Sequence, residues 1–204
     1  MGQIPFKNLC LLVLVCCAKG NSQQALVDLA SLPSNFTYEI RYATSDNFMG
    51  TVLYPCAKCL LRAEVAEALL EANQYFCEKG YQIKIYDCYR PLDIQKAMWS
   101  KVPNAAYVAN PYDKGSVHNR GAAVDITLVT LEGCEVAMGT DYDYFGKEAH
   151  IDNLQLPETI LSNRNLLLEG MKQFGFQPIR TEWWHFSFIR NYQFPILNEP
   201  LPCD

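Results

Sequence analysis

Histidine, positive charge and long apolar runs are all scarce in this sequence. The 204 residues include 3 histidines, and 17 lysines and arginines stand against 22 acidic residues, for a formal net charge of −5. A surface that neutralises nucleic-acid phosphates needs the opposite balance, so nucleic acid is not an expected partner. The chain also lacks internal repeats and low-complexity linkers. With 50% hydrophobic residues, its length and composition are those of one folded domain.

The longest apolar run lies at the N-terminus and is too short to cross a membrane. It spans residues 9–18 and ends with Ala18, with Lys7 before it and Gly20 close behind. A membrane span needs about 20 apolar residues, whereas this pattern is typical of a secretory signal peptide. We therefore expect residues 1–20 to be a cleaved signal and residues 21–204 to be a secreted or periplasmic domain without a stable membrane span. The alternatives are an uncleaved anchor, a buried N-terminal helix, or a lipoprotein cut before Cys16 or Cys17.

Six of the nine cysteines lie beyond the expected signal and predict disulfides in an exported protein. The spacing of Cys56 and Cys59 would also suit a structural zinc or a redox pair. A zinc ribbon needs a second closely spaced pair, and a thioredoxin-type pair belongs in a βαβ unit, neither of which the sequence contains. Disulfides are thus the expectation, with the pairing left open. The six cysteines are Cys56, Cys59, Cys77, Cys88, Cys134 and Cys203.

Hydrophobic periodicity predicts an α+β fold. Segments with apolar residues at helical spacing alternate along the chain with segments of strand-like alternation. We expect a single domain in which a central antiparallel sheet packs against helices. The expected helices cover 60–79, 91–101 and 163–175, and the expected strands cover 81–88, 122–129 and 184–189.

The first candidate site motif is the segment 116–125, SVHNRGAAVD, which contains one of the three histidines. His118 and Asp125 would lie roughly 23 Å apart in a fully extended chain, so binding one metal ion requires a bend. The Asn-Arg-Gly sequence between them is turn-forming. The alternative is a polar turn that runs into a strand, with Asp125 forming only local hydrogen bonds.

The second motif is TEWWHF, residues 181–186, with Glu182 and His185 three positions apart. A hydrolytic zinc requires three protein ligands, an open position for water and a nearby base. His118, Asp125 and His185 would then be the ligands and Glu182 the base, with the two tryptophans shielding the site from bulk water. The alternative is a tryptophan-rich core strand with a glutamate at its edge.

The third motif is YDCYRP, residues 86–91, in which Arg90 follows an expected strand. A guanidinium buried beside a zinc could stabilise the oxyanion that forms when water adds to an amide carbonyl. The alternative for Arg90 is an ordinary surface ion pair.

In this order the motifs resemble the zinc D-alanyl-D-alanine dipeptidases of the vancomycin-resistance type. That family belongs to a larger group with D,D-carboxypeptidases, phage peptidoglycan endopeptidases and the hedgehog signalling fold. The resemblance covers nearly the whole mature chain. It rests on the segments 41–50, 86–91, 116–128, 138–146 and 182–186.

The resemblance implies a role for each matching residue. Zinc ligands, one ion per chain, would be His118, Asp125 and His185. The catalytic base would be Glu182, and Arg90 would stabilise the tetrahedral intermediate. Asp143 would bind the free amino group of the substrate. The positions that line the dipeptide pocket would be Ser116, Tyr54 and Tyr42.

The implied activity is hydrolysis of D-Ala-D-Ala to free D-alanine, in peptidoglycan turnover or scavenging. The vancomycin-resistance enzymes act in the cytoplasm, whereas we expect this chain to be exported, which favours a different biological role. Two alternatives remain open: a D,D-carboxypeptidase or endopeptidase acting on longer cell-wall peptides, and a non-catalytic zinc-containing binding module.

Overall fold

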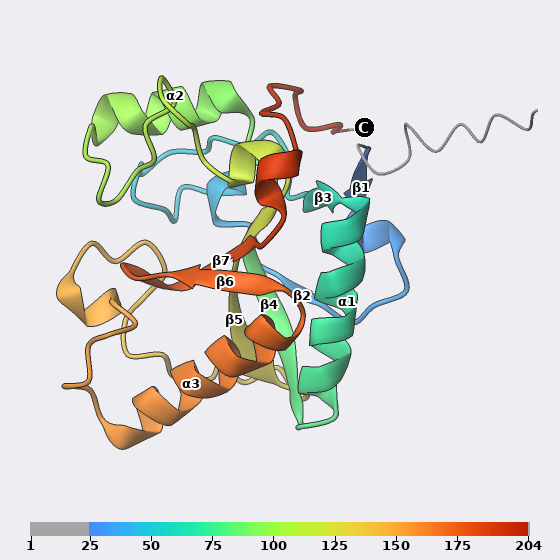
Figure 1. The fold of residues 1–204 in the computed structure, drawn as a ribbon, viewed down its shortest axis with the longest axis vertical. Helices are drawn as coiled ribbons and strands as arrows, with labels where there is room; N and C mark the ends of the chain where they lie inside the picture. The colour runs from blue at the N-terminus through green and yellow to red at the C-terminus, as the bar shows by residue number, and fades with distance from the viewer. Residues whose placement is uncertain (1–24, 204) are drawn as a thin grey trace, which may run out of the picture.

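The computed structural model describes residues 25–203, so the expected signal peptide over 1–20 lies outside the described part. Within it the chain folds as an α+β structure, which confirms the predicted fold class (Figure 1). The helices are α1 (Ala63–Cys77), α2 (Leu92–Lys101) and α3 (Glu158–Gln173). The strands are β1 (Leu26–Asp28), β2 (Thr37–Tyr38), β3 (Leu60–Arg62), β4 (Tyr81–Asp87), β5 (Ala123–Thr130), β6 (Phe176–Ile179) and β7 (Glu182–Phe188). None of the helices within 25–203 is long and apolar enough to cross a membrane.

The main sheet has the strand order β2-β4-β5-β7-β6, and β1 and β3 form a separate antiparallel pair. All neighbours from β4 to β6 are antiparallel, as expected. The correction concerns the edge, where the two-residue strand β2 runs parallel to β4. A strand of two residues has no readable alternation, so the sequence pattern could not predict it.

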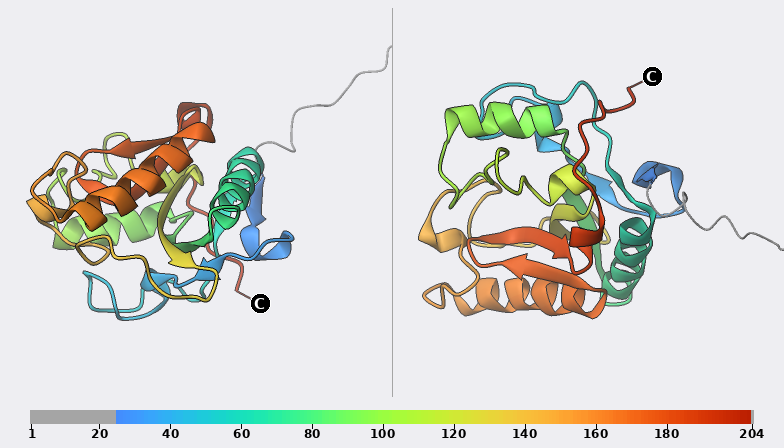
Figure 2. Two further views of the ribbon diagram at one scale, coloured as in Figure 1. Left: turned by 90° about the horizontal axis from the view of Figure 1, so that it is seen from below. Right: turned by 45° about the horizontal axis from the view of Figure 1, so that its top comes forward.

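Helices cover the two faces of the sheet unequally (Figure 2). Helix α1 packs against β4, and α3 packs against β6, β7 and α1. The two helices approach closely at Gly170 of α3, where an added Cβ would lie 2.3 Å from the Phe76 ring of α1. Helix α2 lies on the opposite side of the sheet from α3 (Figure 2), and the long connections run near it.

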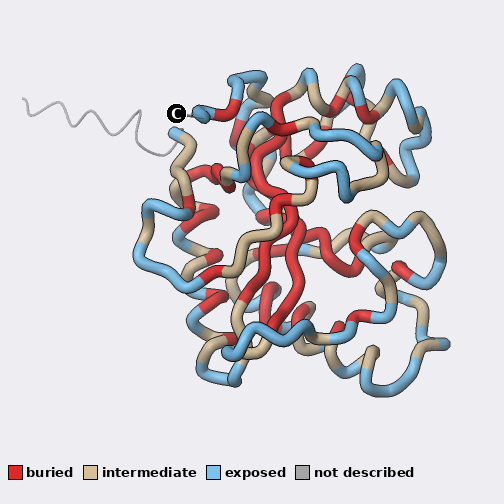
Figure 3. Tube along the Cα trace, turned by 180° about the vertical axis from the view of Figure 1, so that it is seen from behind, coloured by how far each residue is buried: buried red, intermediate tan, exposed pale blue. Residues whose placement is uncertain are grey.

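The central strands are buried on both faces (Figure 3). In β5 every residue except Thr130 is buried, including the polar side chains of Asp125 and Thr127. Val124 and Ile126 join the hydrophobic core, and burial of such side chains contributes about 1.5 to 3 kcal/mol each. The opposite face of β5 holds Asp125 and Thr127, both 3% exposed. Polar side chains at such depth need partners, and those of Asp125 belong to the candidate site.

Three predicted boundaries are corrected by the structure. Helix α1 begins at Ala63 instead of residue 60, because Leu60–Arg62 pair with β1 as strand β3. Helix α3 begins at Glu158, directly after Pro157, and is therefore five residues longer at its start than expected. Strand β7 begins at Glu182, two residues early. In each case tertiary pairing or a proline, which suits a helix start, decides the boundary.

Two disulfides connect distant parts of the chain, namely Cys56–Cys203 and Cys59–Cys88. Cys56 and Cys59 are thus both disulfide-bonded, but not to each other. Among residues 25–203, Cys77 and Cys134 carry free thiols. Two disulfides therefore form where the six cysteines allowed up to three.

Candidate active site

A sharp turn brings His118 back over strand β5. His118 begins a short 3-10 helix, η3 (His118–Arg120), and Gly121 ends it with a left-handed φ of 65°. A side chain is disfavoured at such a φ, and a Cβ on Gly121 would also lie 2.5 Å from the Leu26 side chain. The Asn-Arg-Gly sequence therefore forms the bend that shared metal binding by His118 and Asp125 requires.

Strand pairing brings the other site residues to the same face of the sheet. Asp125 in β5 lies directly opposite His185 in β7, so their side chains share one face. The register of β4 shifts between Ile85 and Asp87, and Asp87 thereby pairs with Asp125 as well. A bulge of this kind moves a side chain to the other face of the sheet, and bulges are frequent beside active sites.

A second irregularity places Glu182 beside His185. On β7, Phe186 pairs with Pro178 while Glu182 pairs with the very next residue, Ile179. Residues three apart on a regular strand point to opposite faces, but the extra residues in this bulge put both side chains on the cavity side. Glu182 Oε2 lies 4.0 Å from His185 Nδ1.

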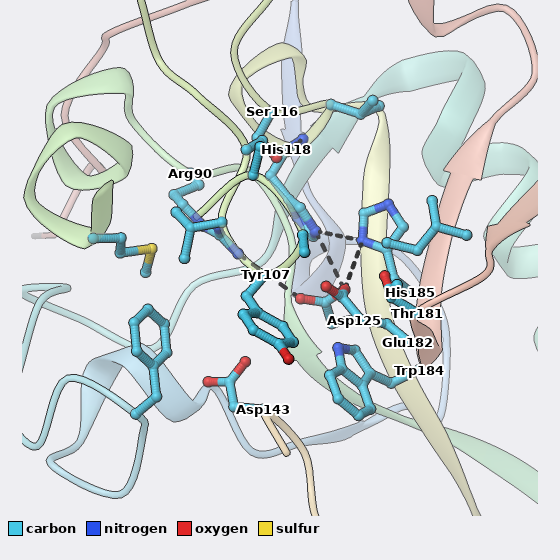
Figure 4. Close-up of a pocket in the computed structure, with 18 of the residues that line it drawn as sticks. Arg90, Tyr107, Ser116, His118, Asp125, Asp143, Thr181, Glu182, Trp184 and His185 are labelled. Atoms are coloured by element: carbon cyan, nitrogen blue, oxygen red, sulfur yellow. Dashed lines mark hydrogen bonds and ion pairs between the residues drawn. The ribbon is translucent and has the colours of Figure 1, made fainter. Parts of the chain in front are cut away.

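Three donor atoms converge in a small triangle (Figure 4). His118 Nε2 lies 3.1 Å from His185 Nδ1 and 3.2 Å from Asp125 Oδ1, and the latter two atoms are 3.0 Å apart. A tetrahedral zinc with bonds of about 2.0 to 2.1 Å separates its donor atoms by roughly 3.3 Å. The triangle thus has the size and the nitrogen and oxygen donors of a three-ligand zinc site.

The remaining ring nitrogens have partners of their own. His118 Nδ1 lies 2.7 Å from the Cys88 carbonyl oxygen, so it carries the proton and leaves Nε2 as a lone-pair donor. His185 Nε2 lies 2.9 Å from the Oγ atom of Ser187, two residues further along β7. Such outer contacts fix the orientation of metal-binding histidines. The second oxygen of Asp125 accepts a hydrogen bond from the Tyr142 hydroxyl at 2.9 Å.

Arg90 is a buried residue of the site, not a surface residue. Its side chain is 9% exposed and forms an ion pair with Asp87, which is fully buried. Its Nη1 donates to Gln95 Oε1 at 2.8 Å, and its guanidinium lies 5.0 Å from the ring centre of Tyr42. Burial by itself lowers the pKa of Arg90, but the Asp87 carboxylate and the neighbouring tyrosine hydroxyls together outweigh this effect and raise the pKa well above its ordinary value. Its Nη2 is 3.8 Å from Asp125, which places a permanent positive charge beside the triangle.

Asp143 lies across the cavity from the two histidines (Figure 4). Within 25–203 it is the one residue other than glycine with a positive φ, 59°, a conformation that is often found at functional sites. The Tyr42 hydroxyl donates to its carboxylate, with distances of 3.2 and 3.1 Å to the two oxygens. Burial, with a smaller contribution from the Asp125 charge, raises the pKa of Asp143 to about 7. An ammonium group at this position would relieve that penalty.

Glu182 is the second carboxyl group of the cavity with a raised pKa. Burial raises its pKa to about 8, although the nearby His185 lowers it. A carboxyl group whose pKa lies near neutrality suits general acid and base catalysis.

These residues line one cavity of about 220 Å³. Ser116 and Tyr42 lie in its wall, as the resemblance implies. Tyr54 is outside the wall, because its hydroxyl donates to Asp87 at 2.7 Å from behind. Of the two expected shielding tryptophans, only Trp184 lines the cavity, whereas Trp183 donates to Thr140 elsewhere. The apolar part of the wall includes Phe48, Met98, Tyr107 and Phe145.

Sequence reasoning missed three polar residues that support the site. Asp87 and Gln95 hold Arg90, and Tyr142 holds Asp125. Asp87 carried a usable signal, since it is an acidic residue at the end of the expected strand 81–88 and lies in the same YDCYRP motif as Arg90. Gln95 and Tyr142 lie in a helix and a loop whose positions only the fold determines.

Two imidazoles and a carboxylate converge in one cavity, with a carboxyl group and a buried guanidinium beside them. This combination defines a metal-dependent hydrolase. The chain belongs to the D-ala-D-ala dipeptidase family, Peptidase M15, whose family model matches residues 22–203. The resemblance deduced from the sequence is thereby confirmed.

Curated relatives agree with this assignment over most of their length. The D-alanyl-D-alanine dipeptidase of Escherichia coli (strain K12) is 35% identical over 178 residues, which cover 87% of this chain and 92% of the relative. The enzyme of the same name from Streptomyces coelicolor is 31% identical, covering 80% and 90% of the two chains. The one from Enterococcus faecalis is 30% identical, covering 74% and 85%.

Among solved structures, VanYB in complex with D-alanine-D-alanine is 16% identical, with a TM-score of 0.43, covering 67% of this chain and 76% of that chain. A vancomycin-resistance D,D-pentapeptidase in complex with Zn(II) is 15% identical with a TM-score of 0.42, covering 67% and 77%. The family assignment rests on the sequence matches.

Proposed function

We propose that this protein is a zinc-dependent dipeptidase that hydrolyses D-Ala-D-Ala with one water molecule to two molecules of D-alanine. The observation that carries the proposal is the donor triangle of His118, Asp125 and His185 facing Glu182, Arg90 and Asp143 within a single cavity. The family membership of the chain supports the substrate class.

One zinc ion per chain would be held by His118 Nε2, His185 Nδ1 and Asp125 Oδ1. Zinc supplies Lewis-acid chemistry at such a site, since it lowers the pKa of water and polarises a carbonyl group. The donor set supports zinc because two nitrogen lone pairs and a carboxylate oxygen that face one another repel unless a cation lies between them.

Glu182 is the general base in this proposal. Its carboxylate takes a proton from the attacking water and later transfers that proton to the leaving amino group. Its place 4.0 Å from His185 Nδ1 supports this role, because water must be activated beside the metal ligands.

Arg90 stabilises the negative charge that develops on the carbonyl oxygen. Asp87 and Gln95 hold its guanidinium rigidly, so little reorganisation is needed when charge develops. Arg90, held in place by Asp87 and Gln95, is thus suited to bind the transition state.

Asp143 selects dipeptides by pairing with the free ammonium of the substrate. A longer peptide has an uncharged amide in that position, which leaves the half-buried carboxylate without a cation. The small volume of the cavity, about 220 Å³, also favours a short substrate. The competing assignment, a D,D-carboxypeptidase on longer cell-wall peptides, needs neither feature.

We also infer that residues 1–20 direct secretion and that residues 21–204 form the mature domain, which acts in peptidoglycan turnover or scavenging. Two disulfides support an oxidising location, because disulfides persist mainly outside the cytoplasm.

The decisive test is Glu182→Gln, with Glu67→Gln on the exposed surface of α1 as control. We expect Glu182→Gln to reduce kcat for D-Ala-D-Ala by roughly 100- to 10,000-fold while zinc binding is retained, because only the base is removed. Zinc content by atomic absorption and kinetics with D-Ala-D-Ala, L-Ala-L-Ala and a D-Ala-terminated pentapeptide provide the measurement. Unchanged kcat in Glu182→Gln would exclude this mechanism, and preferential pentapeptide cleavage would favour the carboxypeptidase.

A further inference from the structure

The segment 87–90 touches the candidate metal centre twice. The carbonyl of Cys88 accepts the hydrogen bond from His118 Nδ1 at 2.7 Å and so fixes which nitrogen of His118 faces the metal position. Two residues later, the Arg90 side chain lies beside Asp125. The position of this short backbone segment therefore affects a metal ligand and the adjacent cation together.

The same Cys88 is covalently attached to Cys59 by a disulfide. Both cysteines are 1% exposed, so the crosslink lies inside the core. The sulfur of Cys88 is bound to the residue before β3 while its carbonyl is bound to His118. A single residue thus connects the disulfide directly to the hydrogen bond of a metal ligand.

Strand β3 forms backbone hydrogen bonds both with the segment 87–90 and with the turn that carries His118. The backbone nitrogen of Tyr89 donates to the Leu60 carbonyl at 3.0 Å. Two residues further along β3, the backbone nitrogen of Arg62 donates to the Gly121 carbonyl at 2.9 Å, next to the turn that carries His118. Strand β3 therefore holds both segments that must stay in register, and the disulfide fixes its first end.

We propose that the Cys59–Cys88 disulfide is a positioning element of the metal centre. It keeps the Cys88 carbonyl where it orients His118, and thereby raises the affinity of the site for zinc. The choice of zinc rests on the function proposed above, whereas the effect on metal affinity holds for any divalent ion that the triangle binds.

The second disulfide provides a matched control. Cys56–Cys203 closes a loop of 147 residues, against 29 for Cys59–Cys88, and the hydrogen bonds described for the metal ligands involve neither of its cysteines. Because loop-closure entropy grows with loop length, its removal should cost the fold more stability. If both crosslinks are purely structural, removing Cys56–Cys203 should cause the larger loss of both stability and zinc affinity. If Cys59–Cys88 positions the metal ligands, its removal should cause the larger loss of zinc affinity.

The test uses two double variants of the full chain, Cys59→Ala/Cys88→Ala and, as the control, Cys56→Ala/Cys203→Ala, each compared with wild type. Zinc affinity is measured by competition with a chromophoric chelator, well below the unfolding temperature of both variants. We expect the first pair to bind zinc roughly 10- to 100-fold more weakly, the range for loss of an outer contact of a metal ligand. The control should stay within about twofold of wild type although its thermal midpoint falls further.

A second measurement detects the hydrogen bond itself. In metal-free protein, the ¹⁵N shifts of the His118 ring should report the Nδ1-protonated tautomer in wild type and in the control, and a mixture of tautomers in Cys59→Ala/Cys88→Ala. Cys59→Val/Cys88→Ala is a second variant that refills the core should the first not fold. Equal zinc affinity in both disulfide variants, or failure of both Cys59 variants to fold, would overturn the proposal. A zinc effect without any D-Ala-D-Ala hydrolysis would leave it standing and refute the proposed function alone.

Discussion

Asp143 and Glu182 are the two acidic side chains of the cavity whose pKa values burial raises, to about 7 and about 8. Most buried charges in proteins are paired within the chain, as Asp87 and Arg90 are here. In contrast, within residues 25–203 the carboxylate of Asp143 accepts hydrogen bonds only from the Tyr42 hydroxyl. Carboxyl groups with strongly raised pKa values cluster at functional sites, which is consistent with the roles proposed for these two residues.

The raised pKa of Asp143 makes the stability of the metal-free protein depend on pH. Its folded pKa of about 7 lies above the ordinary value of 3.8, so between these values the folded state holds a proton that the unfolded state has lost. This residue therefore lowers stability as pH rises through that window, by at most about 1.4 kcal/mol per pH unit. We expect Asp143→Asn to remove that contribution. Urea unfolding of metal-free wild type and Asp143→Asn at pH 4 and pH 8 measures it, and an equal difference at both pH values would contradict the prediction.

Among the helices and strands, backbone irregularities build the site from strands that sequence patterns predict well. The expected strands 81–88, 122–129 and 184–189 overlap closely with β4, β5 and β7. The bulge in β7 and the left-handed Gly121 then determine which side chains reach the cavity. Alternation predicts faces only for a regular strand, so Glu182 and His185 could not be placed on one face from their spacing.

The turn at Gly121 should be sensitive to substitution in a way that another left-handed glycine is not. Gly50 has a similar φ of +67° and no heavy atom within 4 Å of an added Cβ, whereas a Cβ on Gly121 meets Leu26 at 2.5 Å. We expect Gly50→Ala to cost about 1 to 2 kcal/mol of unfolding free energy through backbone strain, and Gly121→Ala to cost more.

Gly121→Ala should also weaken zinc binding, because the displaced turn carries His118, and Gly50→Ala should not. Chemical unfolding and chelator competition on both variants measure the two effects. Equal losses in the two variants would show that the fit against Leu26 has no influence on the site.

In the molecule as a whole, the candidate metal site joins parts of the chain that are far apart in sequence. His118 and Asp125 come from η3 and β5, and His185 comes from β7 near the end of the domain. A metal ion bound to all three crosslinks the folded state and has no equivalent site in the unfolded chain. Binding should therefore stabilise the fold as a whole.

Metal removal should lower the thermal midpoint of the wild-type protein. Free zinc at 100 times its dissociation constant would add about 2.7 kcal/mol, and a chelator abolishes this gain. Asp125→Asn should show little dependence on zinc, while His150→Asn should behave as wild type because His150 contacts Arg180 outside the cavity. Calorimetry with and without chelator gives the comparison, and a zinc-independent midpoint in wild type would refute a structural contribution of the metal.

The fold class, most of the long elements and the family could be predicted from the amino-acid sequence, because they depend on local periodicity and on motifs that lie within a few residues. The sequence also indicated His118, Asp125 and His185 as metal ligands, since it contains only 3 histidines. Arg90 was indicated by its motif, YDCYRP. The tertiary structure alone decided the pairing of the cysteines, the support of Arg90 by Asp87 and Gln95, and the position of Tyr54 behind the cavity. These features depend on strand register and on contacts between residues distant in sequence, which no local pattern encodes.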